Sequence, residues 1–102
     1  DIFLNVAGGA RLTEPAADLA MLLAVASSHL DRPVPTNAVV FGEVGLAGEV
    51  RAVTQPEPRI SEAAKLGFEQ CLLPEGNLRR LSGGSIVLQG VSTVQEALEL
   101  LL

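Results

Sequence analysis

Few residues of this chain have side chains that could carry out chemistry. His29 is its only histidine and Cys71 its only cysteine. The sequence has no Gly-x-x-x-x-Gly-Lys phosphate loop, no Cys-x-x-Cys pair and no His-Glu-x-x-His, so it encodes neither nucleotide hydrolysis nor a zinc site. We expect His29, at the end of an apolar segment, to be a cation near a helix C-terminus rather than a catalytic base. Cys71 lies in an apolar run and is expected to be a core thiol, not a reactive one.

A glycine-containing segment near the middle of the chain is the second candidate region. Its glycines, Gly42, Gly45 and Gly48, favour turn geometry over a phosphate cradle, because no lysine follows at the required spacing. Glu43 and Glu49 flank the turn. We expect these two carboxylates to be solvated or paired with Arg51, and the alternative is a contact across a subunit boundary.

Three segments together resemble the proteolytic domain of Lon-type proteases: Gly8-Gly9-Ala10, Glu14 to Ala20 and Phe41 to Val50. In that family a Gly-Pro-Ser-Ala-Gly motif opens a helix and supplies a serine nucleophile. A Gly-Glu-x-x-Leu-x-Gly-x-Val hairpin follows, and a lysine further along the chain takes the proton of the serine. The resemblance implies the Lon proteolytic-domain-like fold, which is similar to the second domain of ribosomal protein S5.

The catalytic positions of that family are occupied here by residues that cannot do the same chemistry. The serine position falls on Ala16, whose methyl group cannot attack a carbonyl. The lysine position falls on Arg59, and a guanidinium stays protonated at neutral pH. Phe41 replaces the threonine that precedes Gly42 in the family. The resemblance therefore implies a degenerate dyad and no peptidase activity.

The sequence resembles the C-terminal domain of the RadA (Sms) family of bacterial DNA repair proteins more closely than any active Lon. The residues that carry this resemblance are Gly8-Gly9, Glu14 to Ala20, Arg32 to Pro35, Phe41 to Arg51 and Glu62 to Phe68. The family implies a non-proteolytic scaffold in a protein that also has a zinc finger and a RecA-like ATPase. Such proteins form hexameric rings on DNA and promote branch migration. ATP, magnesium and zinc belong to those other domains, and we expect no cofactor or metal in this chain.

The roles of several polar residues have two possible interpretations. Glu14 and Asp18 suit a helix N-terminus by charge alone, but Glu14 is also predicted to pair with Arg59 where the serine and lysine once stood. The candidate DNA contacts are Arg59, Lys65, Arg79 and Arg80. Arg79 and Arg80 read most simply as a solvated basic pair, yet six copies in a ring would concentrate their charge around a channel.

Two rival functions remain open at this point. One is an active Ser-Lys peptidase with a shifted nucleophile such as Ser27 or Ser61. The other is a protein-docking module that uses the vestigial cleft and does not touch DNA.

Apolar runs and punctuating residues predict the elements that position these side chains. A strand is expected from Asp1 to Ala7, and a helix from Thr13 to about Ser28. This helix is apolar almost all round, so we expect it to be covered on several sides by sheet, helix or partner subunit. Further strands are expected at Ala38 to Gly42 and Glu49 to Val53, joined by a turn.

The second half of the chain completes the prediction. A helix is expected from about Pro58 to Leu66 with Ile60, Ala63, Ala64 and Leu66 inward. Strands follow at Phe68 to Leu73 and Ser85 to Gln89, and a capping box at Thr93 to Glu96 begins a last helix. The sequence thus predicts an α/β (α+β) fold of about five strands and three helices, in one domain spanning residues 1–102.

Composition narrows the function classes. The formal charge of −5 disfavours a strong nonspecific polyanion binder, so any DNA contact must be local. No apolar run approaches the about 20 residues of a membrane helix, and the single cysteine suits a reducing cytoplasm. We expect a cytoplasmic protein without membrane contact. The leucine-rich end, Leu98 to Leu102, and the apolar first helix predict exposed hydrophobic surface, which a homo-oligomer would use.

Overall fold

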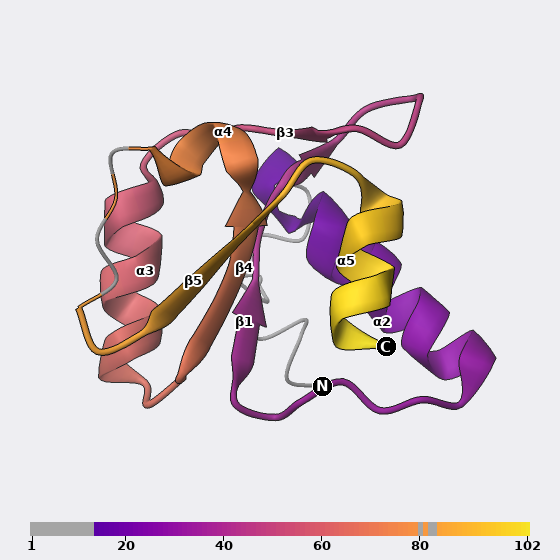
Figure 1. The fold of residues 1–102 in the computed structure, drawn as a ribbon, viewed down its shortest axis with the longest axis horizontal. Helices are drawn as coiled ribbons and strands as arrows, with labels where there is room; N and C mark the ends of the chain where they lie inside the picture. The colour runs from indigo at the N-terminus through magenta and orange to yellow at the C-terminus, as the bar shows by residue number, and fades with distance from the viewer. Residues whose placement is uncertain (1–13, 80, 82–83) are drawn as a thin grey trace.

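A three-stranded parallel sheet lies at the centre of the computed structural model, which describes residues 14–79, 81 and 84–102 (Figure 1). Its strands are β1 (Ala38–Val40), β4 (Gln70–Pro74) and β5 (Val87–Val91), in the order β1-β4-β5. Val39 pairs with Cys71, and Cys71 pairs with Leu88 on its other side. The α/β class predicted from the sequence is confirmed.

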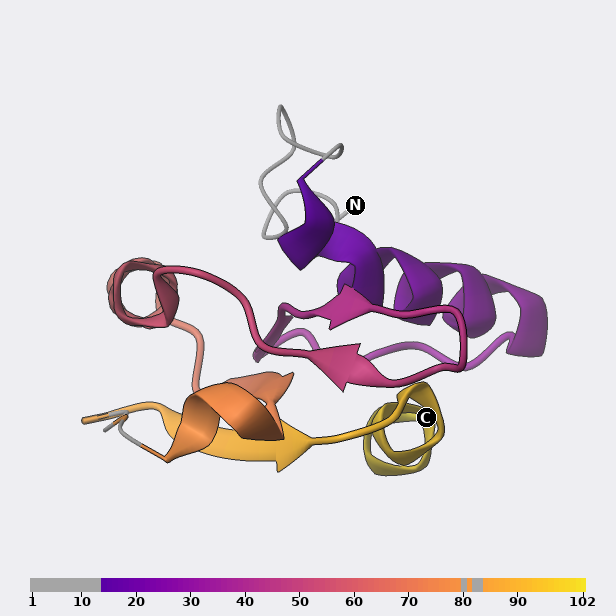
Figure 2. The ribbon, with the colours of Figure 1, turned by 90° about the horizontal axis from the view of Figure 1, so that it is seen from above.

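The sheet is covered on both faces along β1 and β4, which are apolar apart from the exposed Gln70, as is usual for parallel strands that lie between helices. On one face, Val40 and Leu72 pack with Leu19 and Leu23 of α2 (Asp18–Leu30) and Ala97 of α5 (Val94–Leu101). On the opposite face, Val39, Cys71 and Leu73 pack with Ile60 and Ala63 of α3 (Pro56–Lys65). The layers are therefore α2 and α5, the sheet, and α3, as Figure 2 shows from above.

A short antiparallel hairpin, β2 (Glu43–Val44) and β3 (Val50–Arg51), projects beside the sheet. The prediction that the strand at Ala38 to Gly42 would flank this turn directly is wrong. β1 pairs with the distant β4, and β2 is a separate strand that begins after Gly42. Of the two turn glycines, Gly48 has a positive φ of 83°. The base of the hairpin is tied to the last helix, because the amide of Val50 donates to the carbonyl of Ser92 at 2.8 Å.

The first helix begins as a turn of 3-10 helix, η2 (Pro15–Ala17), and continues as α2 to Leu30. It ends at Asp31, which takes a left-handed conformation with φ 53° and caps the last carbonyls. The sheet, α5 and β2 contact it on one side. On the outer side Leu22 is 43% and Val25 66% exposed, so the described residues do not cover this helix on several sides.

The second helix, α3, begins two residues earlier than predicted. Pro56 occupies its first turn, where the missing amide hydrogen costs nothing, and Gln55 before it has a φ of 54°. The two prolines thus start the helix instead of forcing an extended approach to it. Ile60 and Ala63 are buried as predicted, but Leu66 is 64% exposed and does not point inward.

The remaining elements include one that the sequence analysis did not predict, the short helix α4 (Glu75–Leu78). The capping box of α5 is confirmed, since Thr93 accepts from the amide of Glu96 and the carboxylate of Glu96 accepts from the amide of Thr93. The strand predicted at residues 1–7 and the cap predicted at Thr13 lie outside the described residues. No helix in the described part of the chain is long and apolar enough to span a membrane.

Candidate functional site

Three hydrogen bonds hold η2 and the start of α2 against Gly42 and β2. The amide of Gly42 donates to the carbonyl of Ala16 at 2.8 Å, and the amide of Leu19 donates to the carbonyl of Gly42 at 3.0 Å. The amide of Val44 donates to a carboxylate oxygen of Asp18 at 3.1 Å. These bonds fix the position of Ala16, the residue that the Lon resemblance aligns with a nucleophile.

Ala16 is almost completely enclosed, with 5% of its surface exposed. Its carbonyl is used by Gly42, and its side chain is a methyl group without a nucleophilic atom. Ala16 is therefore part of the core.

Arg59, which stands at the lysine position, comes from the first turns of α3 and reaches back to this helix start. Its guanidinium forms an ion pair with the carboxylate of Glu14. A second nitrogen donates to the carbonyl of Thr54 at 3.2 Å, and the guanidinium carbon lies 6.0 Å from the centre of the Phe41 ring. Both paired side chains are 27% exposed, so the pair is half-buried. The structure thus brings Glu14 and Arg59 together.

The ring of Phe41 lies next to the Arg59 guanidinium of this pair. It is 6% exposed and packs in the cluster between the sheet and α3, together with Val39, Ile60 and Leu73. An aromatic face near a guanidinium is attracted to it electrostatically. The residue that replaces the family threonine therefore contributes packing and a weak cation–π contact, with no group that could orient a nucleophile.

The tip of the hairpin is organised by Glu49. Its carboxylate pairs with Arg51 at 2.8 Å and accepts from the amide of Ala47 at 3.1 Å. The hydrogen bond from Arg51 is the main cause that lowers the pKa of Glu49, and the same bond raises the pKa of Arg51. A Cβ on Gly45 would lie 2.1 Å from this carboxylate, so a larger residue at this position would displace the end of the Glu49 side chain. Glu43 faces Arg51 across the strands; a contact of either carboxylate with another subunit stays a prediction.

The candidate DNA contacts do not gather in one place. Arg59 is engaged by Glu14, while Lys65 and Arg79 are exposed. Arg79 lies beside Pro56 and Glu57, at the start of α3, and lines a shallow depression with them. Lys65 lies at the other end of the same helix, which separates the two by about 13 Å along its axis. Arg80 lies outside the described residues.

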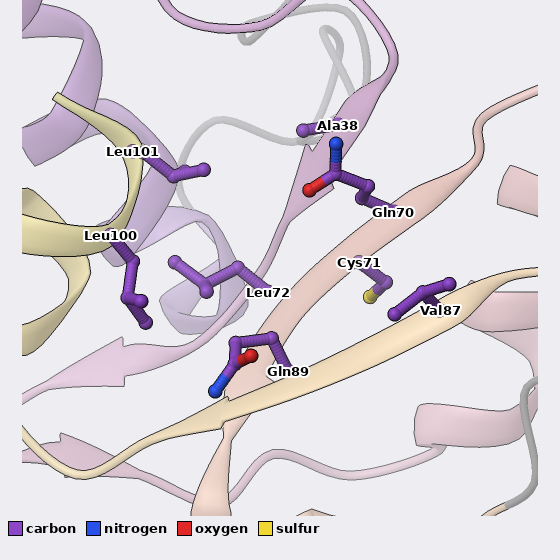
Figure 3. Close-up of a pocket in the computed structure, with 8 residues that line it drawn as sticks. All are labelled: Ala38, Gln70, Cys71, Leu72, Val87, Gln89, Leu100 and Leu101. Carbon is purple, nitrogen blue, oxygen red and sulfur yellow. The ribbon is translucent and has the colours of Figure 1, made fainter.

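A groove that the sequence analysis missed lies where the end of α5 meets the sheet (Figure 3). It encloses about 100 Å³. Leu100 and Leu101 lie on one side of it, and the amides of Gln70 and Gln89 rise from the sheet on the other. Val87, which also lines the groove, is 66% exposed on the edge strand β5.

The two other residues with reactive side chains are Cys71 and His29. Cys71 is buried, and desolvation raises the pKa of its thiol to about 12, as suits a core residue. His29 lies exposed in the last turn of α2. No group of three or more histidine, cysteine, aspartate or glutamate side chains is arranged for a metal ion within residues 14–79, 81 and 84–102.

Comparison with known proteins gives a consistent set of matches. The family described as subunit ChlI of Mg-chelatase matches residues 1–77. The DNA repair protein RadA of Escherichia coli (strain K12) is 50% identical over 98 residues, which cover 96% of this chain and 21% of that protein. RadA of Chlamydia pneumoniae is 50% identical over 105 residues, covering 100% and 23%, and RadA of Aquifex aeolicus (strain VF5) is 48% identical over 101 residues, covering 99% and 22%. The chain spans about a fifth of the length of these curated relatives.

Proposed function

This chain belongs to the family described as subunit ChlI of Mg-chelatase and is a RadA-type sequence, and we propose that it serves DNA repair as a non-proteolytic, Lon-like scaffold domain. In this proposal the chain is one part of a longer protein whose RecA-like ATPase drives branch migration. The scaffold supports assembly of a hexameric ring and its association with DNA in the cytoplasm. ATP, magnesium and zinc act in the other domains.

The observation that carries the proposal is the ion pair between Glu14 and Arg59 beside a buried Ala16. A Ser-Lys dyad needs a nucleophile and a base that can be neutral. This chain has instead a methyl group and a guanidinium neutralised by a carboxylate, which is an arrangement that joins two helices. The ion pair between Glu14 and Arg59 therefore supports a structural role, in which it joins the start of α2 to the start of α3.

The apolar outer face of α2 and the partly exposed end of α5 support the oligomeric part of the proposal. Val25 is 66% and Leu100 51% exposed. Apolar surface of this kind is typical of protein–protein interfaces. A ring would also increase the attraction for DNA. A chain of net charge −5 attracts DNA poorly unless cations from several copies are concentrated.

The rival peptidase finds little support at the two serines that it would use. The hydroxyl of Ser27 donates to the carbonyl of Arg32 and helps to end α2. Ser61 and Lys65 are one turn apart on the exposed side of α3, where water solvates the ammonium group. A lysine base needs burial or a neighbouring cation to become neutral near pH 7. Neither serine therefore has the surroundings of an activated nucleophile.

The experiment compares three forms of the full-length protein: unaltered, lacking residues 1–102, and with Arg79→Ala/Arg80→Ala. We expect a mass of six subunits for the unaltered protein and a smaller mass for the truncated one. We expect the double variant to stay hexameric and to bind duplex DNA with a smaller dependence on salt concentration, since each lost phosphate contact lowers the slope by about 0.9. Arg51→Ala is the matched control, because this arginine is already paired with Glu49.

Two results would contradict the proposal in different ways. A truncated protein that still forms hexamers would remove the scaffold role. Hexamers whose DNA affinity and salt dependence are the same in the Arg79→Ala/Arg80→Ala variant would remove the DNA contact and favour the alternative of a protein-docking module.

A further inference from the structure

The outer edge of β5 is open in the described part of the chain. Successive residues of a strand form their backbone hydrogen bonds on alternate edges. The amide of Val87 donates to the carbonyl of Glu69, beside β4, at 2.9 Å, so the backbone groups of Leu88 and Gly90 face away from β4. No described residue pairs with these outward groups. Figure 2 shows β5 at the lower rim of the molecule, with no described helix or strand beyond it.

The side chains of β5 alternate between the two faces of the sheet. Val87 and Gln89 lie on the α5 side, where they line the groove next to Leu100 (Figure 3). Ile86 and Leu88 lie on the α3 side, in or against the core cluster there. Val87 is 66% exposed, although a valine in a strand is stabilised by a neighbour on the same face. An added strand would supply that neighbour.

A carboxylate stands over the middle of this edge. A Cβ on Gly90 would lie 3.0 Å from a carboxylate oxygen of Glu75, in α4. Glu75 is exposed and belongs to neither ion pair of the described residues. Arg79, one turn further along the chain, lines the depression at the start of α3 instead. A strand added beside Gly90 would therefore meet an acid that has no basic partner among the described residues.

We propose that β5 is a docking edge for an extended segment of a partner protein in which apolar and basic residues alternate. Strand addition of this kind uses main-chain hydrogen bonds for affinity and alternate side chains for specificity. The outward amides and carbonyls of Leu88 and Gly90 pair with the segment. Its apolar side chains pack beside Val87, and its basic side chains meet Glu75 on the other face. The inference goes beyond the scaffold proposal, because it requires neither DNA nor a ring.

The charges at the edge favour a basic partner over a second copy of this chain. The sequence of β5, Val-Leu-Gln-Gly-Val, has no basic residue, so a second β5 laid against the first leaves both Glu75 carboxylates without a partner. The net charge of −5 also attracts a basic segment. An acid on an open edge can serve only to prevent accidental strand pairing, and the experiment distinguishes that role from docking.

The test is fluorescence polarisation of a labelled peptide of about six residues, with lysine and valine in alternation, titrated with the 102-residue chain. We expect a dissociation constant on the order of 100 µM, because one added strand is a small interface. Glu75→Gln should weaken binding at least about threefold. Glu62→Gln, an exposed acid on α3, is the matched control and should leave binding unchanged. A peptide with glutamate in place of lysine should not bind.

Hydrogen exchange followed by NMR locates the contact. At a peptide concentration about ten times the dissociation constant, exchange of the Leu88 and Gly90 amides should slow about tenfold. The Gln89 amide, which faces β4, should not change. N-methylation of the peptide at all its valines or at all its lysines should abolish binding in one of the two patterns only, because alternate residues face β5.

Three results would overturn the inference. Absence of peptide binding up to about 1 mM would leave Glu75 as a guard against accidental pairing. Binding that leaves the exchange of the Leu88 and Gly90 amides unchanged would place the peptide elsewhere on the acidic surface. Protection of the same two amides without peptide, rising with the concentration of the chain, would make a second copy the occupant of the edge.

Discussion

The ion pair between Glu14 and Arg59 offers the sharpest prediction about stability. Its side chains are 27% exposed, which places it between exposed ion pairs, worth about 0.2–1 kcal/mol, and charged hydrogen bonds, worth about 1.5–3 kcal/mol. We therefore expect a coupling free energy of about 1–2 kcal/mol between the two residues. It is measured by a double-mutant cycle of Glu14→Gln, Arg59→Met and the double variant, from urea unfolding of each chain.

The two single variants should not be equal. Arg59→Met also removes the hydrogen bond to the carbonyl of Thr54 and the contact with Phe41, so it should cost about 1 kcal/mol more than Glu14→Gln. Arg59→Lys is the informative control, because it keeps the charge but loses the second donor and the planar group that faces the ring. A coupling energy below about 0.3 kcal/mol would mean that the pair does not fasten α2 to α3, and would refute the structural role assigned to it.

Three further predictions concern the rest of the molecule. Thr93→Ala should destabilise the chain by about 1 kcal/mol, measured by urea unfolding, because it removes the acceptor of the Glu96 amide in the capping box; an unchanged midpoint would contradict this. Gly45→Ala should cost only about 0.5–1 kcal/mol in the same assay, because the Glu49 carboxylate that it displaces lies at the end of a flexible side chain; the effect should disappear in a Glu49→Ala background. The Cys71 thiol has a pKa raised to about 12 in the folded chain, so the unfolded state loses its proton first as pH rises. Stability should therefore fall above the unfolded pKa, from about pH 9 toward pH 12, and a Cys71→Ala chain should lack that part of the fall.

Local signals in the sequence predicted some elements well. The capping box that begins α5 depends on residues within one turn, and the end of the apolar run near Asp31 depends on local backbone chemistry. The pairing of β1 with β4 could not be predicted in this way, because it joins segments about thirty residues apart. The helix α4 was missed since Gly76 and Asn77 have low helix propensity. Its stability comes from tertiary contacts, in which the Asn77 side chain exchanges hydrogen bonds with the backbone of Val53 at 2.9 and 3.0 Å.

For the candidate site, too, some features could be predicted from the sequence and others could not. Residue type alone predicts that Ala16 has no nucleophilic atom and that Arg59 is not a neutral base, and the acid at Glu14 suggested the partner of Arg59. The carbonyl of Thr54 could not be predicted as a third partner, because it reaches Arg59 only through the left-handed turn at Gln55, with φ 54°. The groove beside Leu100 depends on how far α5 extends over the sheet, which no local pattern determines.

We propose that Ala16 and Arg59, the residues at the positions of a Lon-type dyad, hold the fold together and hydrolyse nothing. This proposal is tested by treating the chain with a serine-reactive fluorophosphonate probe and, in parallel, with an unfolded protein substrate over a day. We expect no labelled serine and no cleavage, for the unaltered chain and for Ala16→Ser alike, because Arg59 cannot accept a proton in either. Labelling of Ser27 or Ser61, together with cleavage that disappears when that serine is replaced by alanine, would contradict it.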